Sequence, residues 1–167
     1  MDILSHALWV LAFYKIINIE LKKKLSILKA VFWGLFPDLF TFTIPFLFVI
    51  VSLLSGKHTS PETLFSNSSF ISILYFLSHS LIIFLIIFFL CYFIFKRFIW
   101  ELGGWFLHII IDIPSHGSGT WATPYLWPFP SPIIIGIDWW TNSWIVLFNY
   151  TLLVIVFIYI IVRIKKH

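Results

Sequence analysis

Five apolar stretches follow one another along the chain, and polar or charged residues separate them. They cover residues 3–19, 30–54, 70–95, 98–113 and 144–162. At about 1.5 Å per residue, the third stretch is long enough to cross a hydrocarbon core of about 30 Å. Gly34 and the pair Pro37-Asp38 interrupt the second stretch, which we therefore expect to be a broken span. The pattern predicts an all-α, polytopic membrane protein with about five transmembrane spans.

Composition supports this interpretation. The chain has 167 residues, of which 60% are hydrophobic and 11% charged, and soluble domains carry about 25% charged residues. At this length we expect a single integral membrane domain over residues 1–167. Segments 20–29, 55–69 and 114–143 connect the stretches, and the last is a Pro- and Trp-rich loop that we expect on the outer side.

The basic residues predict an orientation. Of the eleven Lys and Arg residues, ten fall on one side of the membrane if the chain crosses five times, which leaves Lys57 alone on the other. Because basic residues accumulate in cytoplasmic loops, we expect the N-terminus outside and the C-terminus in the cytoplasm. The same distribution explains the net charge of +4 without a nucleic-acid partner.

Residues 103–128 contain a group of histidine and aspartate side chains. His108 and Asp112 are four residues apart and share a helical face. Pro114 removes a backbone donor and bends or ends the helix, so His116 lies just beyond it and is free to turn back. Nitrogen and oxygen atoms presented in this way suit a divalent metal ion.

Further ionisable residues lie inside or at the ends of other apolar stretches, and a charge at the bilayer centre costs roughly 2.5–3.5 kcal/mol. A bound divalent ion would offset this cost. The candidate ligands are His6, Asp38, His79, His108, Asp112 and His116. Counted from the span ends, they form a column open to the outer face. A lone His or Asp can instead form a helix–helix hydrogen bond, so a metal-free bundle stays open.

Two other acids have simpler interpretations. Glu101 lies seven residues before His108 on the same helical face, where it could support a ligand, but an acid at the end of a helix explains it as well. Asp138 precedes Trp139 in the loop, and we expect it to bind backbone groups rather than to act in catalysis.

His nitrogens and carboxylate oxygens favour zinc, as one or two ions, and manganese or iron(II) suits the same ligands. The chain contains neither G-x-S-x-G nor H-E-x-x-H, which favours attack by metal-activated water over a covalent intermediate. Asp38 and Asp112 are the candidate catalytic bases. The alternatives are a non-enzymatic metal-binding scaffold and an ion-binding transporter. A catalytic metal keeps an open position, whereas a structural metal is closed by protein ligands.

The order of the motifs resembles a known family. The chain starts Met-Asp-x-x-x-His, continues with Gly34-x-x-Pro37-Asp38 and His79, and then has His108-x3-Asp112, His116 and a Thr-Pro-x-x-Trp-Pro motif over residues 123–128. Over nearly its whole length it looks like the YdjM-type inner-membrane metal-dependent hydrolases of prokaryotes. It is remotely similar to zinc-dependent phospholipase C.

The resemblance implies specific roles. Asp38, His79, His108 and Asp112 would bind one zinc ion, and Asp112 would bridge to a second near His6 or His116. No His-x3-Glu follows His116, unlike in the phospholipase, so a third metal is not expected.

The resemblance also implies a substrate. It would be a phosphoester of a lipid or another amphiphile, entering past Trp121, Tyr125 and Trp127. The expected partners are the lipid bilayer and this lipid-like substrate, and a homo-oligomer is compatible with the sequence. The expected location is the cytoplasmic membrane of a prokaryote.

Overall fold

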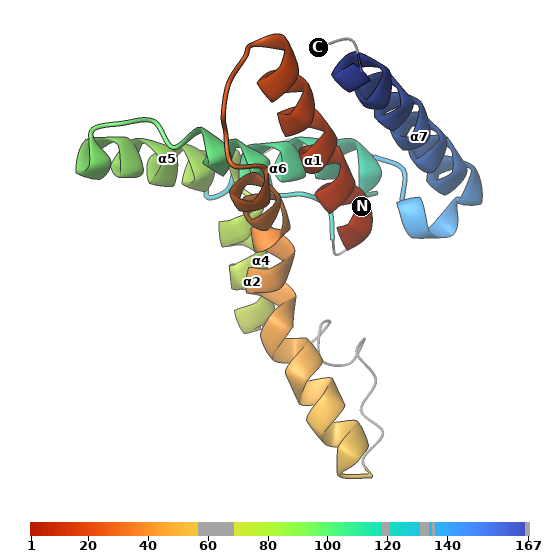
Figure 1. Ribbon diagram of the computed structural model, residues 1–167. Coiled ribbons are helices and arrows are strands. Elements are labelled where there is room, and N and C mark those ends of the chain that lie inside the picture. Colours follow the sequence, from red (N-terminus) through yellow and green to blue (C-terminus); the bar gives the residue numbers. More distant parts are fainter. Residues whose placement is uncertain (57–68, 118–120, 131–133, 135, 166–167) are drawn as a thin grey trace.

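The computed structural model describes residues 1–56, 69–117, 121–130, 134 and 136–165 (Figure 1). Within these ranges all regular structure is helical. The α-helices are α1 (Ile3–Glu20), α2 (Ile27–Leu54), α4 (Ser69–Ser78), α5 (Leu81–Phe95), α6 (Gly103–Ser115) and α7 (Ser143–Lys165), and short 3₁₀ turns form η1 (Trp100–Leu102) and η2 (Trp139–Thr141).

The structure supports a helical membrane protein but does not confirm five spans. Within the described ranges, α1, α2 and α7 are long and apolar enough to cross a bilayer, and α4 with α5 would add a fourth if the bent pair is one span. Helix α6 has 13 residues and is only about 20 Å long, short of the roughly 30 Å core. Large apolar side chains such as Leu54, Leu28 and Trp144 are strongly exposed, as expected for a surface that faces lipid.

Residues 70–95 are not one straight helix, contrary to the simplest interpretation of their sequence. Helices α4 and α5 meet at an angle of 59°, with His79 and Ser80 between them. The Ser80 hydroxyl caps α5, accepting from Ile82 N at 3.2 Å, and donates to the Trp127 carbonyl at 2.6 Å. Trp105 Nε1 donates to the Ser78 carbonyl at 2.6 Å. A break among apolar residues is stable here because its backbone groups have partners.

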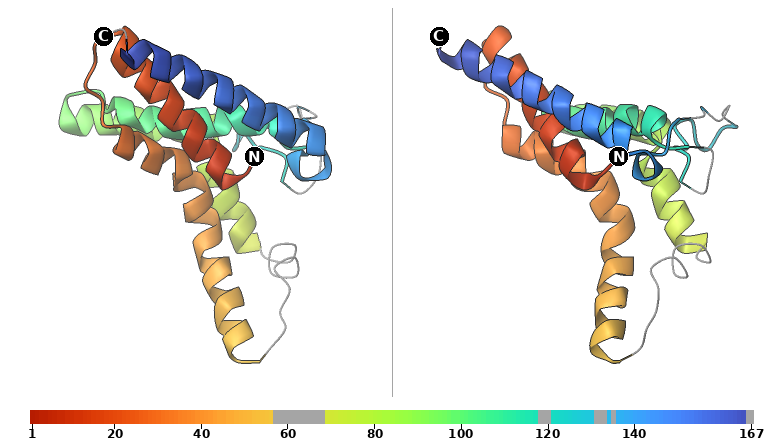
Figure 2. Two further views of the ribbon diagram at one scale, coloured as in Figure 1. Left: turned by 45° about the vertical axis from the view of Figure 1, so that its right-hand side comes forward. Right: turned by 90° about the vertical axis from the view of Figure 1, so that its right-hand side faces the viewer.

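The predicted break in the second span takes a milder form. Helix α2 stays helical through both Pro37 and Pro45. Figure 2 shows it bending where its colour passes from brown to orange, after which it extends away from the other helices beside α4. Membrane helices tolerate proline when neighbouring groups satisfy the freed carbonyls. The bend keeps the first part of α2 against α1 and α6.

Helices α1 and α7 run side by side in the same direction (Figures 1 and 2). At one end Arg163 Nη2 lies 2.7 Å from Glu20 Oε2, and at the other the Tyr150 hydroxyl donates to Asp2 at 3.0 Å. The ends of α1 and α7 that adjoin basic residues therefore lie together.

Small residues let α6 lie in the middle of the helices. A Cβ atom on Gly104 would collide with the Ala30 carbonyl oxygen, and one on Gly34 would come within 2.6 Å of Val10 Cγ2. Close approach at small residues is the usual way in which helices pack in membranes. It brings the inner face of α6, which carries His108 and Asp112, against α1 and α2.

Candidate metal centre

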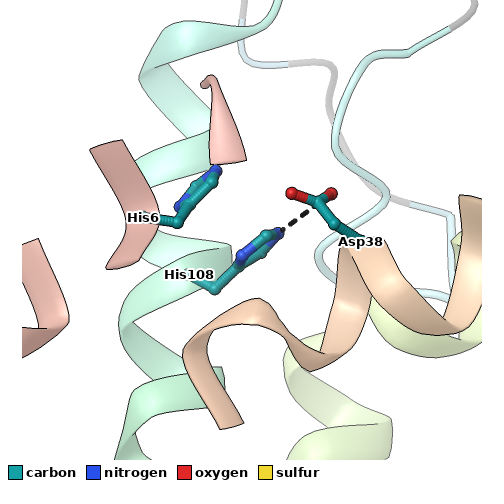
Figure 3. Close-up of side chains that lie close together, drawn as sticks. All are labelled: His6, Asp38 and His108. Atoms are coloured by element: carbon teal, nitrogen blue, oxygen red, sulfur yellow. Dashed lines mark ion pairs between the residues drawn. The ribbon is translucent and has the colours of Figure 1, made fainter. Parts of the chain in front are cut away.

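The six candidate ligands come together in one cluster, in which His6, His79, His108 and Asp112 are buried. They are His6 on α1, Asp38 on α2, His79 at the α4–α5 break, His108 and Asp112 on α6, and His116 at its end. Figure 3 shows His6, His108 and Asp38 pointing toward one another from three helices. Two sets have ligand atoms close enough to hold one ion: His6, Asp38 and His108, and His79, His108 and Asp112.

Asp112 lies at the centre of this cluster. Its Oδ2 atom is 3.1 Å from His108 Nε2 and 3.5 Å from His79 Nε2. Its Oδ1 atom is 3.0 Å from His6 Nε2 and 3.2 Å from His116 Nε2. One carboxylate thus faces two pairs of imidazole nitrogens, one pair on each oxygen.

Asp38 lies beside His79 and His108, the two histidines that face Asp112 Oδ2. Its Oδ1 atom lies 3.7 Å from His108 Nε2 and 3.8 Å from His79 Nε2. The Asp38 side chain is 16% exposed, against 2% for Asp112. The two acids therefore differ in access: Asp112 is enclosed by histidines, whereas Asp38 lies at the edge of the cluster.

Backbone carbonyls fix the orientation of the first two imidazoles. His108 Nδ1 lies 2.7 Å from the Gly34 carbonyl oxygen, and His79 Nδ1 lies 3.1 Å from that of Tyr75. A carbonyl oxygen only accepts a hydrogen bond, so these contacts engage Nδ1 of each ring and direct each Nε2 atom into the cluster. The two Nε2 atoms are 3.2 Å apart and face the Asp112 carboxylate. A backbone carbonyl that holds the second ring nitrogen is a usual means by which proteins orient histidine ligands toward a metal ion.

His6 and His116, the two histidines that face Asp112 Oδ1, have different surroundings. The His6 ring stacks on the His108 ring with centroids 3.8 Å apart. Among the described residues, His6 Nδ1 has no hydrogen-bond partner. The Met1 amine lies 2.9 Å from His116 Nε2 and also contacts Asp112 Oδ1. Nothing in the sequence indicated that the Met1 amine would lie at the cluster.

Helix α7 fixes the first turn of α1, which carries His6. The Asp2 carboxylate accepts from Ser5 N at 2.8 Å and from the Ser5 hydroxyl at 2.6 Å. Asn149 Nδ2 donates to that hydroxyl at 2.8 Å, and Trp9 Nε1 donates to Asn149 Oδ1 at 2.7 Å. Burial acts to raise the pKa of Asp2, but the hydrogen bonds from Ser5 and Tyr150 outweigh it and lower this pKa. From the sequence, Asp2 had no predicted role beyond its place in the Met-Asp-x-x-x-His motif, although an Asp directly before an apolar run is a helix-capping signal.

The two remaining acids bind backbone groups. Asp138 Oδ1 accepts from Gly117 N at 2.6 Å, which confirms its predicted role and fixes the chain just after His116. Glu101 Oε1 accepts from Ser26 N at 3.1 Å. Glu101 therefore binds the start of α2, which agrees with its interpretation as an acid at the end of a helix.

A cavity of about 860 Å³ opens onto the cluster. Its walls at this end include Asp38, His79, His116 and Trp121. We expected Tyr125 and Trp127 at the mouth of the cavity. Their backbone carbonyls instead accept hydrogen bonds from Leu81 N and from the Ser80 hydroxyl, respectively, at the α4–α5 break. The cavity makes the Asp38 side of the cluster accessible.

Comparisons with known proteins found no match among family models, curated proteins or solved structures. The arrangement of the cluster can be assessed only from its own chemistry. Buried His and Asp side chains that could hold a metal ion are present.

Proposed function

We propose that this protein is a membrane-bound hydrolase that uses a divalent metal ion, zinc in the first place, to activate water. The observation that carries the proposal is the position of Asp112, whose two oxygens face separate pairs of histidine Nε2 atoms at 3.0–3.5 Å. Asp112 and these histidines would hold divalent ions, whose charge would offset that of the buried carboxylate.

Bound metal ions would supply two kinds of chemistry. They lower the pKa of water towards about 7 and polarise a substrate oxygen. The chain would do the rest. Asp112 has both oxygens among histidines, so it suits a bridging ligand. Asp38 is the more accessible acid and borders the cavity, so it suits a general base that accepts the proton of the attacking water.

The order of the motifs gives a second line of support, because it resembles that of the YdjM-type hydrolases. We place the protein in the cytoplasmic membrane of a prokaryote, with the N-terminus outside and the basic C-terminal residues in the cytoplasm. The ion pair between Glu20 and Arg163 supports a common side for the two basic regions that follow α1 and α7.

Hydrolysis by metal-reconstituted protein tests the proposal. Purified protein in detergent should cleave a chromogenic phosphodiester, lose this activity with a chelator and regain it with zinc. Asp38→Asn should lower turnover by roughly 10²–10⁴, the usual contribution of a general base. Glu101→Gln is the matched control, since this acid binds only the start of α2, and should keep full activity.

Two results would contradict the proposal. Stoichiometric metal without hydrolysis of any tested phosphoester would favour a metal-binding scaffold or an ion transporter. Activity that survives both chelation and Asp38→Asn would mean that the reaction belongs to a contaminant or to another site.

A further inference from the structure

The cavity does not end at the histidine cluster. From Asp38 it continues along one face of α2, where the spacing of three or four residues places successive side chains on one stripe. The stripe consists of Leu39, Phe42, Thr43, Phe46, Leu47 and Ile50. We refer to these six residues as the α2 stripe.

The α2 stripe has the length of a lipid chain. From Asp38 to Ile50 the helix rises about 18 Å at 1.5 Å per residue. Half of a hydrocarbon core of about 30 Å is about 15 Å. A hydrocarbon chain with its polar end at Asp38 would therefore fit along the stripe as far as Ile50.

The two ends of the cavity differ in chemistry. Asp2, Asp38, His79 and His116 line one end, whereas the α2 stripe is apolar apart from Thr43. A wholly polar ligand would leave the stripe uncovered, and a wholly apolar ligand would cover the Asp38 carboxylate without offering it a polar contact. A ligand with a polar head and a hydrocarbon chain satisfies both ends.

The stripe is open along its side. Leu39 is 41% exposed and Leu47 is 56% exposed, although both line the cavity. At the polar end Trp121 forms a wall, since its ring packs edge-on against Phe42 and Tyr75 with centroids 5.5 and 5.4 Å away. A ligand can therefore enter from the bilayer and be stopped at the cluster.

We propose that the substrate is a lipid with an anionic phosphate head, whose chain lies along the α2 stripe while the phosphate reaches the cluster. This proposal rests on the proposed function, because it needs bound metal. Asp112 and Asp38 are the cluster's two acids, and because two divalent ions would exceed the charge of these two carboxylates, they would leave a positive site for phosphate at the polar end of the stripe.

Binding of a matched pair of probes tests the proposal. Myristoyl lysophosphatidate carries both head and chain, and glycerol phosphate carries the same head without a chain. Leu47→Trp should obstruct the stripe and weaken lysophosphatidate binding by at least about tenfold, or about 1.4 kcal/mol, with no change for glycerol phosphate. Phe48→Trp is the matched control: Phe48 is similarly exposed at 53% but does not line the cavity. It should change neither affinity.

A second variant tests the direction of the chain. Ile50 lies at the far end of the stripe, so Ile50→Trp should weaken the myristoyl probe but leave hexanoyl lysophosphatidate unaffected. Metal content and melting temperature equal to those of the unmodified protein show that the variants are folded. Equal affinities in Leu47→Trp and Phe48→Trp would overturn the assignment of the stripe.

Three further results separate the explanations. Lysophosphatidate binding that persists at full strength after chelation means that the stripe holds ordinary bilayer lipid, and overturns the proposal. Self-crosslinking of Leu47→Cys, in a Cys91→Ala background, places a second copy of the chain on this face and overturns it too. Metal-dependent lipid binding without hydrolysis supports the groove and contradicts only the proposed function.

Discussion

Replacing Asp112 by asparagine keeps the size and hydrogen-bonding ability of the side chain but removes its charge. Within the cluster this change reaches both pairs of histidines, because Oδ2 is 3.1 Å from His108 Nε2 and Oδ1 is 3.0 Å from His6 Nε2. Changes in groups that only orient a ligand cost 10–100-fold in metal affinity. Loss of a ligand shared by two ions should cost more than about 100-fold, or about 2.7 kcal/mol at 25 °C.

The assay is competition with a chromophoric zinc chelator, together with elemental analysis of detergent-purified protein. His108→Ala should weaken zinc binding as well, and the double variant should lose less than the sum, because both residues act on one ion. Glu101→Gln should bind zinc normally. If Asp112 is instead an isolated buried acid, Asp112→Asn should be neutral or easier to insert, since an intramembrane charge disappears. Equal zinc affinity in the unmodified protein and in well-folded Asp112→Asn would show that Asp112 is not a metal ligand.

Three other predictions concern the framework around the cluster. Asn149→Ala should lower stability by about 0.6–1.7 kcal/mol, the range for hydrogen bonds in membranes, in chemical denaturation, whereas exposed Thr151→Ala on the same helix should have little effect; equal losses would deny Asn149 its role. Gly104→Ala should lower the melting temperature of the purified protein because its Cβ meets the Ala30 carbonyl oxygen, and an unchanged value would contradict the close packing. A cysteine at Lys23, in a Cys91→Ala background, should resist a membrane-impermeant reagent in intact cells, and labelling from outside would reverse the orientation.

The sequence contained most of the signals for the cluster. His108, Asp112 and His116 are linked by local spacing, and the cost of placing His6, Asp38 and His79 among apolar residues marked them as a group. Local spacing could not show that Asp112 would lie between two pairs of histidines. That arrangement depends on the close approach of α6 to α2 at Gly34 and Gly104, which is a property of packing.

The break beside His79 shows where the sequence reasoning failed. Residues 70–95 are apolar throughout apart from a few polar side chains, and hydropathy averages over them. The local signal was present in Ser80, a residue that favours the start of a helix. A helix break at Ser80 is stable because Trp105 and the loop carbonyls of Tyr125 and Trp127 form hydrogen bonds with the polar groups at the break. These contacts are long-range, so the sequence pattern did not reveal them.

At Pro37 the opposite error occurred: the sequence predicted a break, and the helix continues. Proline removes a backbone donor, which favours a break, but α2 continues past Pro37 and Pro45. The number of spans stays open for a related reason: α6 is apolar enough to be taken for a crossing, yet with 13 residues it is too short for one unless the bilayer thins.

X-ray absorption spectroscopy of purified, zinc-reconstituted protein would show whether the cluster binds metal and through which atoms. We expect one or two zinc ions per chain, bound by imidazole nitrogens and carboxylate oxygens at about 2.0–2.2 Å, with no sulfur ligand because Cys91 lies outside the cluster. Protein that holds no stoichiometric transition metal after reconstitution, or zinc bound through sulfur, would contradict this expectation.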